Sequence, residues 1–125
     1  MARIAAIDDD PAFLAMLHDL LQSEGWEMFG LHESDQAFEE VQQSRPDLVI
    51  LDLRMDTPGW HILTRLKQDP ATRHIPVIVC SAVLHELDGQ GGWLEEHDVG
   101  VLPKPFEIDD LYGCVRAALQ TERPS

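Results

Sequence analysis

Side chains suited to metal-binding and phosphate-binding chemistry follow four apolar runs of this sequence. In chain order they are Asp8, Asp9 and Asp10 after the run that ends at Ile7, Asp52 after Leu48–Leu51, Ser81 after Pro76–Cys80, and Lys104 shortly after Val101 and Leu102. Two unit charges about 4 Å apart repel by roughly 4 kcal/mol at an effective dielectric of about 20, so carboxylates gathered at one site require a compensating cation. Oxygen ligands without neighbouring His or Cys favour a hard ion, and we expect Mg²⁺.

Apolar runs alternate with amphipathic stretches along the chain, which is the pattern of a parallel sheet with crossover helices. The predicted strands are Arg3–Ile7, Trp26–Leu31, Leu48–Leu51, Pro76–Cys80 and Val101–Leu102. Apolar residues spaced three to four apart predict helices that include Phe13–Leu21, Ala37–Val41, Ile62–Leu66 and Ile108–Leu119. The sequence therefore predicts an α/β fold whose chemically active side chains follow the carboxyl ends of the strands, where open parallel sheets bind ligands.

Two of these helices have recognisable starts. Asp10 is predicted to cap the first helix, with Pro11 at its first helical position. Ser34 is predicted to cap the second helix. Asp10 is thus interpreted as the last residue of the acidic turn and as the cap of the helix that follows.

The fourth crossover lacks a clear helical pattern. Gly89, Gly91 and Gly92 fall within it, and each glycine inside a helix costs about 1 kcal/mol relative to alanine. We therefore expect a fourth helix that is short, displaced or mobile and begins near Trp93. Trp93 is expected to pack this helix against the sheet.

Length and composition indicate one domain over residues 1–120 and a polar tail over 121–125. A formal net charge of −14 argues against direct binding of nucleic acid. Apolar runs are too short for membrane insertion and the start lacks a signal-peptide pattern, so we expect a cytoplasmic chain. Cys80 and Cys114 lack metal-ligand spacing and are interpreted as small buried hydrophobic residues, and the six histidines as surface side chains.

The motifs around the active side chains resemble those of the receiver domains of bacterial two-component response regulators, over Ile4 to Leu119. The matching segments are Ile7-Asp8-Asp9-Asp10-Pro11, Leu51-Asp52-Leu53-Arg54-Met55, Cys80-Ser81-Ala82 and Leu102-Pro103-Lys104-Pro105-Phe106. The resemblance implies a flavodoxin-like, doubly wound, five-stranded parallel sheet with strand order 2-1-3-4-5 and five crossover helices.

The resemblance also implies a role for each residue of the site. Asp52 would accept a phosphoryl group from a histidine kinase or phosphotransfer protein. Mg²⁺ would be held by Asp9, Asp52 and the main-chain carbonyl of Arg54, with Asp8 acting mostly through metal-bound water. Ser81 would hydrogen-bond a phosphoryl oxygen and Lys104 would balance its charge. The Lys104–Pro105 bond resembles a cis peptide of the family.

The chain departs from the family pattern at three places. The loop after Asp52, with Met55-Asp56-Thr57-Pro58-Gly59-Trp60, is one residue shorter than usual, and Asp56 is interpreted as a turn residue. Val101 stands where the family has a switch aromatic. Val101 and the glycine-rich fourth crossover both depart from the features that form the usual switching surface of the family.

The favoured hypothesis is a receiver that is not an enzyme but a phosphoacceptor assisting its own phosphoryl transfer and hydrolysis, and that signals to an unidentified protein partner. One alternative is a degenerate receiver that works as a phosphorylation-independent interaction module. Another is a small phosphatase with Asp8 as nucleophile. A flavin-binding protein fits less well, because Asp-Asp-Asp-Pro stands where a phosphate cradle needs Gly, Ser or Thr.

Overall fold

The computed structural model describes residues 2–32, 34–53, 59–82, 89 and 91–120, and it confirms the predicted α/β fold. The strands are β1 (Arg3–Ile7), β2 (Glu27–Leu31), β3 (Leu48–Leu51), β4 (Val77–Ser81) and β5 (Val99–Pro103). The helices are α1 (Pro11–Ser23), α2 (Ser34–Ser44), α3 (Gly59–Gln68), α4 (Gly91–Glu96) and α5 (Ile108–Gln120). All neighbouring strands pair in parallel, in the order β2-β1-β3-β4-β5, as the resemblance implied.

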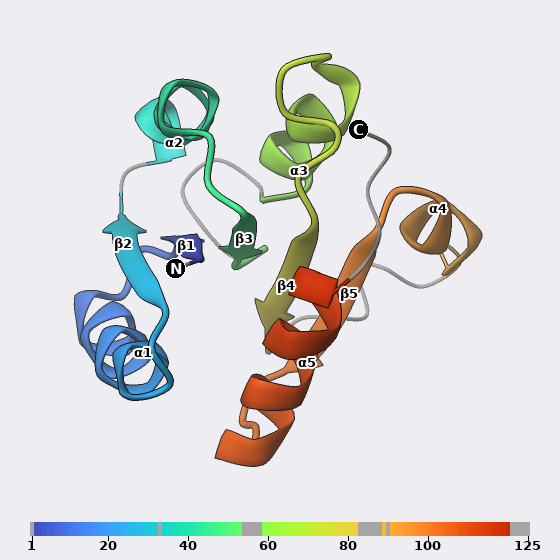
Figure 1. Cartoon of the computed structure of the whole chain (residues 1–125). Helices are drawn as coiled ribbons and strands as arrows, with labels where there is room; N and C mark the ends of the chain where they lie inside the picture. The colour runs from blue at the N-terminus through green and yellow to red at the C-terminus, as the bar shows by residue number, and fades with distance from the viewer. Residues whose placement is uncertain (1, 33, 54–58, 83–88, 90, 121–125) are drawn as a thin grey trace.

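Helices cover both faces of the sheet (Figure 1). One face carries α2, α3 and α4, and the other carries α1 and α5. Every residue of the central strands β3 and β4 is buried. A strand covered on both faces needs apolar side chains in both directions, which explains the unbroken apolar runs in these two strands.

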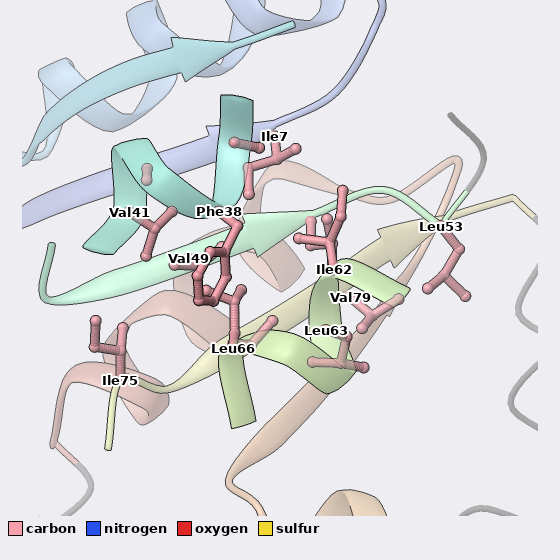
Figure 2. Packing of buried hydrophobic residues seen from close by; sticks show 14 of the residues in the cluster. Ile7, Phe38, Val41, Val49, Leu53, Ile62, Leu63, Leu66, Ile75 and Val79 are labelled. Atoms are coloured by element: carbon pink, nitrogen blue, oxygen red, sulfur yellow. The ribbon is translucent and has the colours of Figure 1, made fainter. Parts of the chain in front are cut away.

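The hydrophobic core is split into two layers by the sheet. Figure 2 shows the layer under α2 and α3, where Phe38 and Val41 of α2 meet Ile62, Leu63 and Leu66 of α3 above the strands. In the opposite layer, leucines of α1 and Leu111 and Val115 of α5 pack on the other side of the same strands. The sheet is therefore held as a rigid platform, and its carboxyl edge is fixed relative to both layers.

The fifth strand is longer than predicted, because it spans Val99–Pro103 and not Val101–Leu102 alone. Its main chain pairs with β4 from Val77 opposite Val99 to Ser81 opposite Pro103. Ladder hydrogen bonds require only main-chain groups, so exposed Gly100 joins the strand without an apolar side chain. Smaller shifts place the start of β2 at Glu27, and β4 one residue later than predicted.

The fourth helix is short, as expected, with six residues, and it begins at Gly91, shortly before Trp93. Gly91 and Gly92 are exposed and occupy its first turn, so their lack of side chains removes no core contact. Leu94 is its buried residue. Half-buried Trp93 packs against the core, as predicted, and its ring lies 5.2 Å from that of Trp60 in α3.

Other expectations from the sequence concern single side chains. Cys80 is buried as predicted, whereas Cys114 is only half-buried. His18, His32, His61 and His74 are exposed, as expected, whereas His97 is half-buried and stacks on Trp93; the sixth histidine lies outside the described residues. Two expectations concern whole segments. No helix in the described ranges has the length and apolar character that a membrane span needs.

Residues 121–125, interpreted as a polar tail, lie outside the described part of the chain.

Candidate functional site

The strand register brings the predicted site residues to one edge of the sheet. Ile7 at the end of β1 lies opposite Leu51 at the end of β3, so the next residues, Asp8 and Asp52, leave the sheet side by side. The main chain holds both, because the Asp52 N–H donates to the Ile7 carbonyl at 2.9 Å and the Asp8 N–H donates to the Leu31 carbonyl at 3.0 Å. The strand order reverses between β1 and β3, which is where open α/β sheets bind ligands.

Three carboxylates converge at this edge. Asp8, Asp9 and Asp52 each offer an oxygen, and these oxygens all lie within 4.8 Å of one another. Asp8 and Asp52 are buried, with 3% and 8% of their surface exposed, whereas Asp9 is exposed. In the described ranges this is the one group of three or more Asp, Glu, His or Cys side chains close enough to share a metal ion.

Lys104 supplies the positive charge that faces the carboxylates. Its Nζ donates to Asp8 Oδ2 at 2.8 Å and lies 3.6 Å from Asp52 Oδ2. Burial alone would lower the pKa of Lys104, but the hydrogen bond to Asp8 and the charges of Asp8 and Asp52 outweigh burial and raise the pKa above its ordinary value. The lysine is therefore a fixed cation at neutral pH.

The main chain positions this lysine. The Lys104 N–H donates to the Ser81 carbonyl at 3.1 Å, which extends the ladder between β4 and β5 by one bond. The Lys104–Pro105 peptide bond is cis, as the resemblance implied. Ser81 is fully buried at the end of β4, so the serine and the lysine stand at the ends of adjacent strands.

Asp8 and Asp10 also fix the first turn of α1. The Asp10 N–H donates to Asp8 Oδ1 at 2.9 Å, and the Asp10 carboxylate accepts from the N–H groups of Ala12 and Phe13, which confirms the predicted cap. Burial raises the pKa of Asp8 above its ordinary value, and the hydrogen bonds from Lys104 and Asp10 oppose that rise. Asp8 is thus a carboxylate whose negative charge needs a cation nearby.

Two predicted features of the site lie outside the described residues. Arg54, whose carbonyl was expected to be a metal ligand, belongs to the segment 54–58, together with Asp56 and most of the shortened loop. The segment 83–88 of the glycine-rich crossover is likewise not described. The structure thus brings together Asp8, Asp9, Asp52 and Lys104, with Ser81 at the adjacent strand end.

Phe13 belongs to the site, although the sequence indicated only an apolar position of the first helix. Its ring centroid lies 3.8 Å from Lys104 Nζ, so the ammonium faces the ring. Phe106 meets Phe13 edge to face, with the ring centroids 6.2 Å apart and the planes at 77°. No local pattern could reveal this contact, because it joins residues 13 and 104 of the chain.

The donor set fits a hard divalent cation. Carboxylate oxygens are the ligands that Mg²⁺ prefers, and three of them lie close together here. Mg²⁺ commonly uses one or two carboxylates together with water and a phosphate oxygen. Lys104 Nζ lies 3.6 Å from Asp52 Oδ2, so an anionic group next to this carboxylate would have a cation within reach. These residues could hold a metal ion and an anionic group side by side.

Comparison with known proteins gives a consistent result. A family model described as the response regulator receiver domain matches residues 4–116. The phosphate regulon transcriptional regulatory protein PhoB of Rhizobium meliloti is 31% identical over 125 residues, which is 99% of this chain and 55% of that protein. The transcriptional regulatory protein CpxR of Escherichia coli K12 is 35% identical over 120 residues, which is 96% of this chain and 50% of that protein. The chain thus spans about half the length of these relatives.

A solved structure shows the same architecture. The crystal structure of a sensor protein from Polaromonas sp. JS666 has a TM-score of 0.84 with 26% sequence identity. The likeness covers 94% of this chain and 95% of that one. The matched region thus includes nearly all of the sheet and the helices.

Proposed function

The chain belongs to the family of response regulator receiver domains, and from this premise we propose that Asp52 accepts a phosphoryl group from a histidine kinase or phosphotransfer protein in a Mg²⁺-dependent reaction. The phosphorylated domain then signals through a protein partner. We further propose that the chain is a phosphoacceptor that assists its own phosphoryl transfer and hydrolysis, and not an enzyme with a separate substrate.

One observation carries this proposal. Asp52 stands at the reversal point of the sheet with Lys104 Nζ 3.6 Å from its Oδ2 and two further carboxylates within 4.8 Å. A carboxylate that served only to solubilise the domain would gain nothing from this crowding, which costs free energy through repulsion and burial. An acceptor needs the crowding, because the same groups neutralise the charge of an incoming phosphoryl group.

The proposed step is an in-line displacement at phosphorus. A carboxylate oxygen of Asp52 forms a bond to phosphorus while the bond from phosphorus to the leaving nitrogen or oxygen of the donor breaks, and the leaving group keeps that electron pair. Lys104 stabilises negative charge on the phosphoryl oxygens, and the Ser81 hydroxyl donates a hydrogen bond to one of them. Asp8, Asp9 and Asp52 would hold Mg²⁺, which supplies further positive charge to those oxygens when bound.

The partners follow from the same chemistry. The donor must present a phosphorylated side chain to the carboxyl edge of the sheet, where the site lies. The net charge of −14 disfavours direct contact of this domain with nucleic acid phosphates, so we propose a protein as its output partner.

Intact mass spectrometry tests the proposal. The chain is incubated with Mg²⁺ and a small acyl phosphate, beside an Asp52→Asn variant and a sample with EDTA. We expect a single phosphoryl adduct on the unaltered chain and none in either control. A chain that stays unmodified with the acyl phosphate and with phosphorylated histidine kinases would contradict the proposal.

A phosphorylation-independent interaction module is the second candidate. The observation that favours it is Val101, which lies on β5 with 39% of its surface exposed at the position of the family's switch aromatic. Valine has a single stiff torsion and cannot swing between buried and exposed positions as an aromatic ring can. This candidate predicts a partner that binds the unaltered chain and the Asp52→Asn variant equally well.

A further inference from the structure

The Lys104 ammonium has two kinds of partner in the structure. The first kind is charged, namely Asp8 at 2.8 Å and Asp52 at 3.6 Å. The second kind is neutral, namely the face of the Phe13 ring, whose centroid is 3.8 Å from Nζ. An ammonium over an aromatic face is attracted by the ring quadrupole at distances up to about 6 Å, so this contact lies well inside the attractive range.

The charged partners are also the groups that the proposed reaction changes. Asp8 and Asp52 belong to the carboxylate group that would hold the metal ion, and Asp52 would become an acyl phosphate. Metal binding and phosphorylation each draw a carboxylate oxygen away from Lys104 or change the charge of that carboxylate. The ring of Phe13 takes part in neither event, so its attraction for the ammonium stays constant while the other partners change.

The local structure holds the ring in place. The Phe13 N–H donates to the Asp10 carboxylate that caps α1, and the edge contact with Phe106 fixes the orientation of the ring. Phe13 is half-buried and stands beside the row formed by Leu14, Leu17 and Leu21, which are the buried residues of α1. Phe13 also packs against the core layer that α1 and α5 form, while its aromatic face lies under the Lys104 ammonium.

We propose that Phe13 is a positioning residue for phosphoryl transfer, which holds the Lys104 ammonium beside Asp52 through a cation–π contact. This inference rests on the proposed function of Asp52. An aliphatic side chain could fill the same volume between α1 and the β5–α5 connection, but it has no face that attracts a cation. The proposal therefore predicts that the phosphorylation rate depends on the π-electron density of the side chain at position 13, and not on its size alone.

The test combines a kinetic and a spectroscopic readout. Phosphorylation by a small acyl phosphate with saturating Mg²⁺ is followed for the unaltered chain, Phe13→Leu and Phe13→Tyr, and for chains carrying mono-, di- and trifluorinated phenylalanine at position 13. We expect the rate to fall about three- to tenfold in Phe13→Leu, to be retained in Phe13→Tyr and to decrease stepwise with fluorination, which weakens the quadrupole at nearly constant size. In NMR spectra the ε-protons of Lys104 should lose an upfield ring-current shift in Phe13→Leu.

The matched control is Phe38→Leu. Phe38 also carries a cation over its ring, with Arg65 Cζ 4.0 Å from the centroid, but it lies in α2 on the opposite face of the sheet. This variant should phosphorylate at the unaltered rate and keep the Lys104 shift. If the fluorinated chains are phosphorylated at the same rate as the unaltered chain, the role of Phe13 is overturned and the proposed function of Asp52 is not. Absence of an adduct on the unaltered chain would overturn the proposed function itself.

Discussion

Replacing Lys104 by methionine tests the electrostatics of the site without touching the proposed phosphoacceptor. Methionine keeps much of the length of the side chain and removes the ammonium that faces Asp8 and Asp52. Asp8, with 3% of its surface exposed, then loses the cation that compensates its burial. We expect the free energy of unfolding to fall at neutral pH, because a buried charge without its partner is costly.

The distances set the size of this loss. At an effective dielectric of about 20, unit charges 2.8 Å and 3.6 Å apart attract by roughly 6 and 5 kcal/mol. Desolvation of the ammonium cancels most of that attraction, and charged hydrogen bonds in proteins contribute about 1.5 to 3 kcal/mol net. We therefore expect Lys104→Met to be less stable than the unaltered chain by about 2 kcal/mol in EDTA at about pH 7.

The pH dependence has a definite sign. Burial already raises the pKa of Asp8, and loss of Lys104 raises it further. A carboxyl whose pKa is raised on folding stabilises the fold below its unfolded-state pKa, and this stabilisation is lost as the pH rises through the folded-state pKa. The deficit of Lys104→Met should therefore be full at neutral pH and vanish under acidic conditions, where Asp8 is protonated in both chains.

Urea unfolding followed by circular dichroism measures these differences, with and without millimolar Mg²⁺. Mg²⁺ should stabilise Lys104→Met more than the unaltered chain, because the metal replaces the missing cation. The control is Lys67→Met, since buried Lys67 donates to the carbonyls of Arg73 and Ile75 and not to a carboxylate. A deficit of Lys104→Met that is the same at every pH and Mg²⁺ concentration would refute the electrostatic argument and indicate lost packing.

Three further predictions concern the scaffold around the site. Burial lowers the pKa of Lys67 from 10.5 to about 8. Above that pH Lys67 stays protonated in the unfolded chain and loses its proton in the folded chain, so folding stability rises towards pH 10. Titrated urea melts should show a rise of up to about 3 kcal/mol that is absent from Lys67→Met, and equal slopes for both chains would contradict this assignment. Asp10→Ala should cost about 1 kcal/mol of unfolding free energy by loss of the α1 cap, and an unchanged urea midpoint would argue against the cap. Amide hydrogens of α4 should exchange faster than those of α1, because α4 buries Leu94 alone whereas α1 buries three leucines, and equal protection would show that α4 is held in some other way.

The sequence predicts most about strands that are buried on both faces, because their apolar residues form an unbroken run. The predicted strand Leu48–Leu51 has its observed bounds, because a strand covered on both faces consists mostly of apolar side chains. Its neighbour Asp52 was then placed correctly at the sheet edge by the rule that ligands bind at the carboxyl ends. The edge strand β5 was underestimated, because Gly100 is exposed and its pairing with Ile78 uses main-chain atoms alone.

Side-chain partners across long stretches of chain were beyond sequence reasoning. The sequence predicts only that Lys104 and Asp8 lie at the same edge of the sheet. The structure shows that Lys104 donates a hydrogen bond to Asp8. The aromatic face of Phe13 was hidden because the same spacing also fits an ordinary core position. Such contacts depend on the packing of α1 against the β5–α5 connection, which no local pattern encodes.

Mapping the phosphoryl group to one residue tests the central claim most directly. The chain is phosphorylated with an acyl phosphate and Mg²⁺, reduced with borohydride to convert an aspartyl phosphate to homoserine, and digested for tandem mass spectrometry. The account predicts homoserine at position 52, and none at positions 8, 9 or 10. Homoserine at position 8 would contradict it and favour the phosphatase hypothesis, and no homoserine at any position would leave the chain without the acceptor that the account requires.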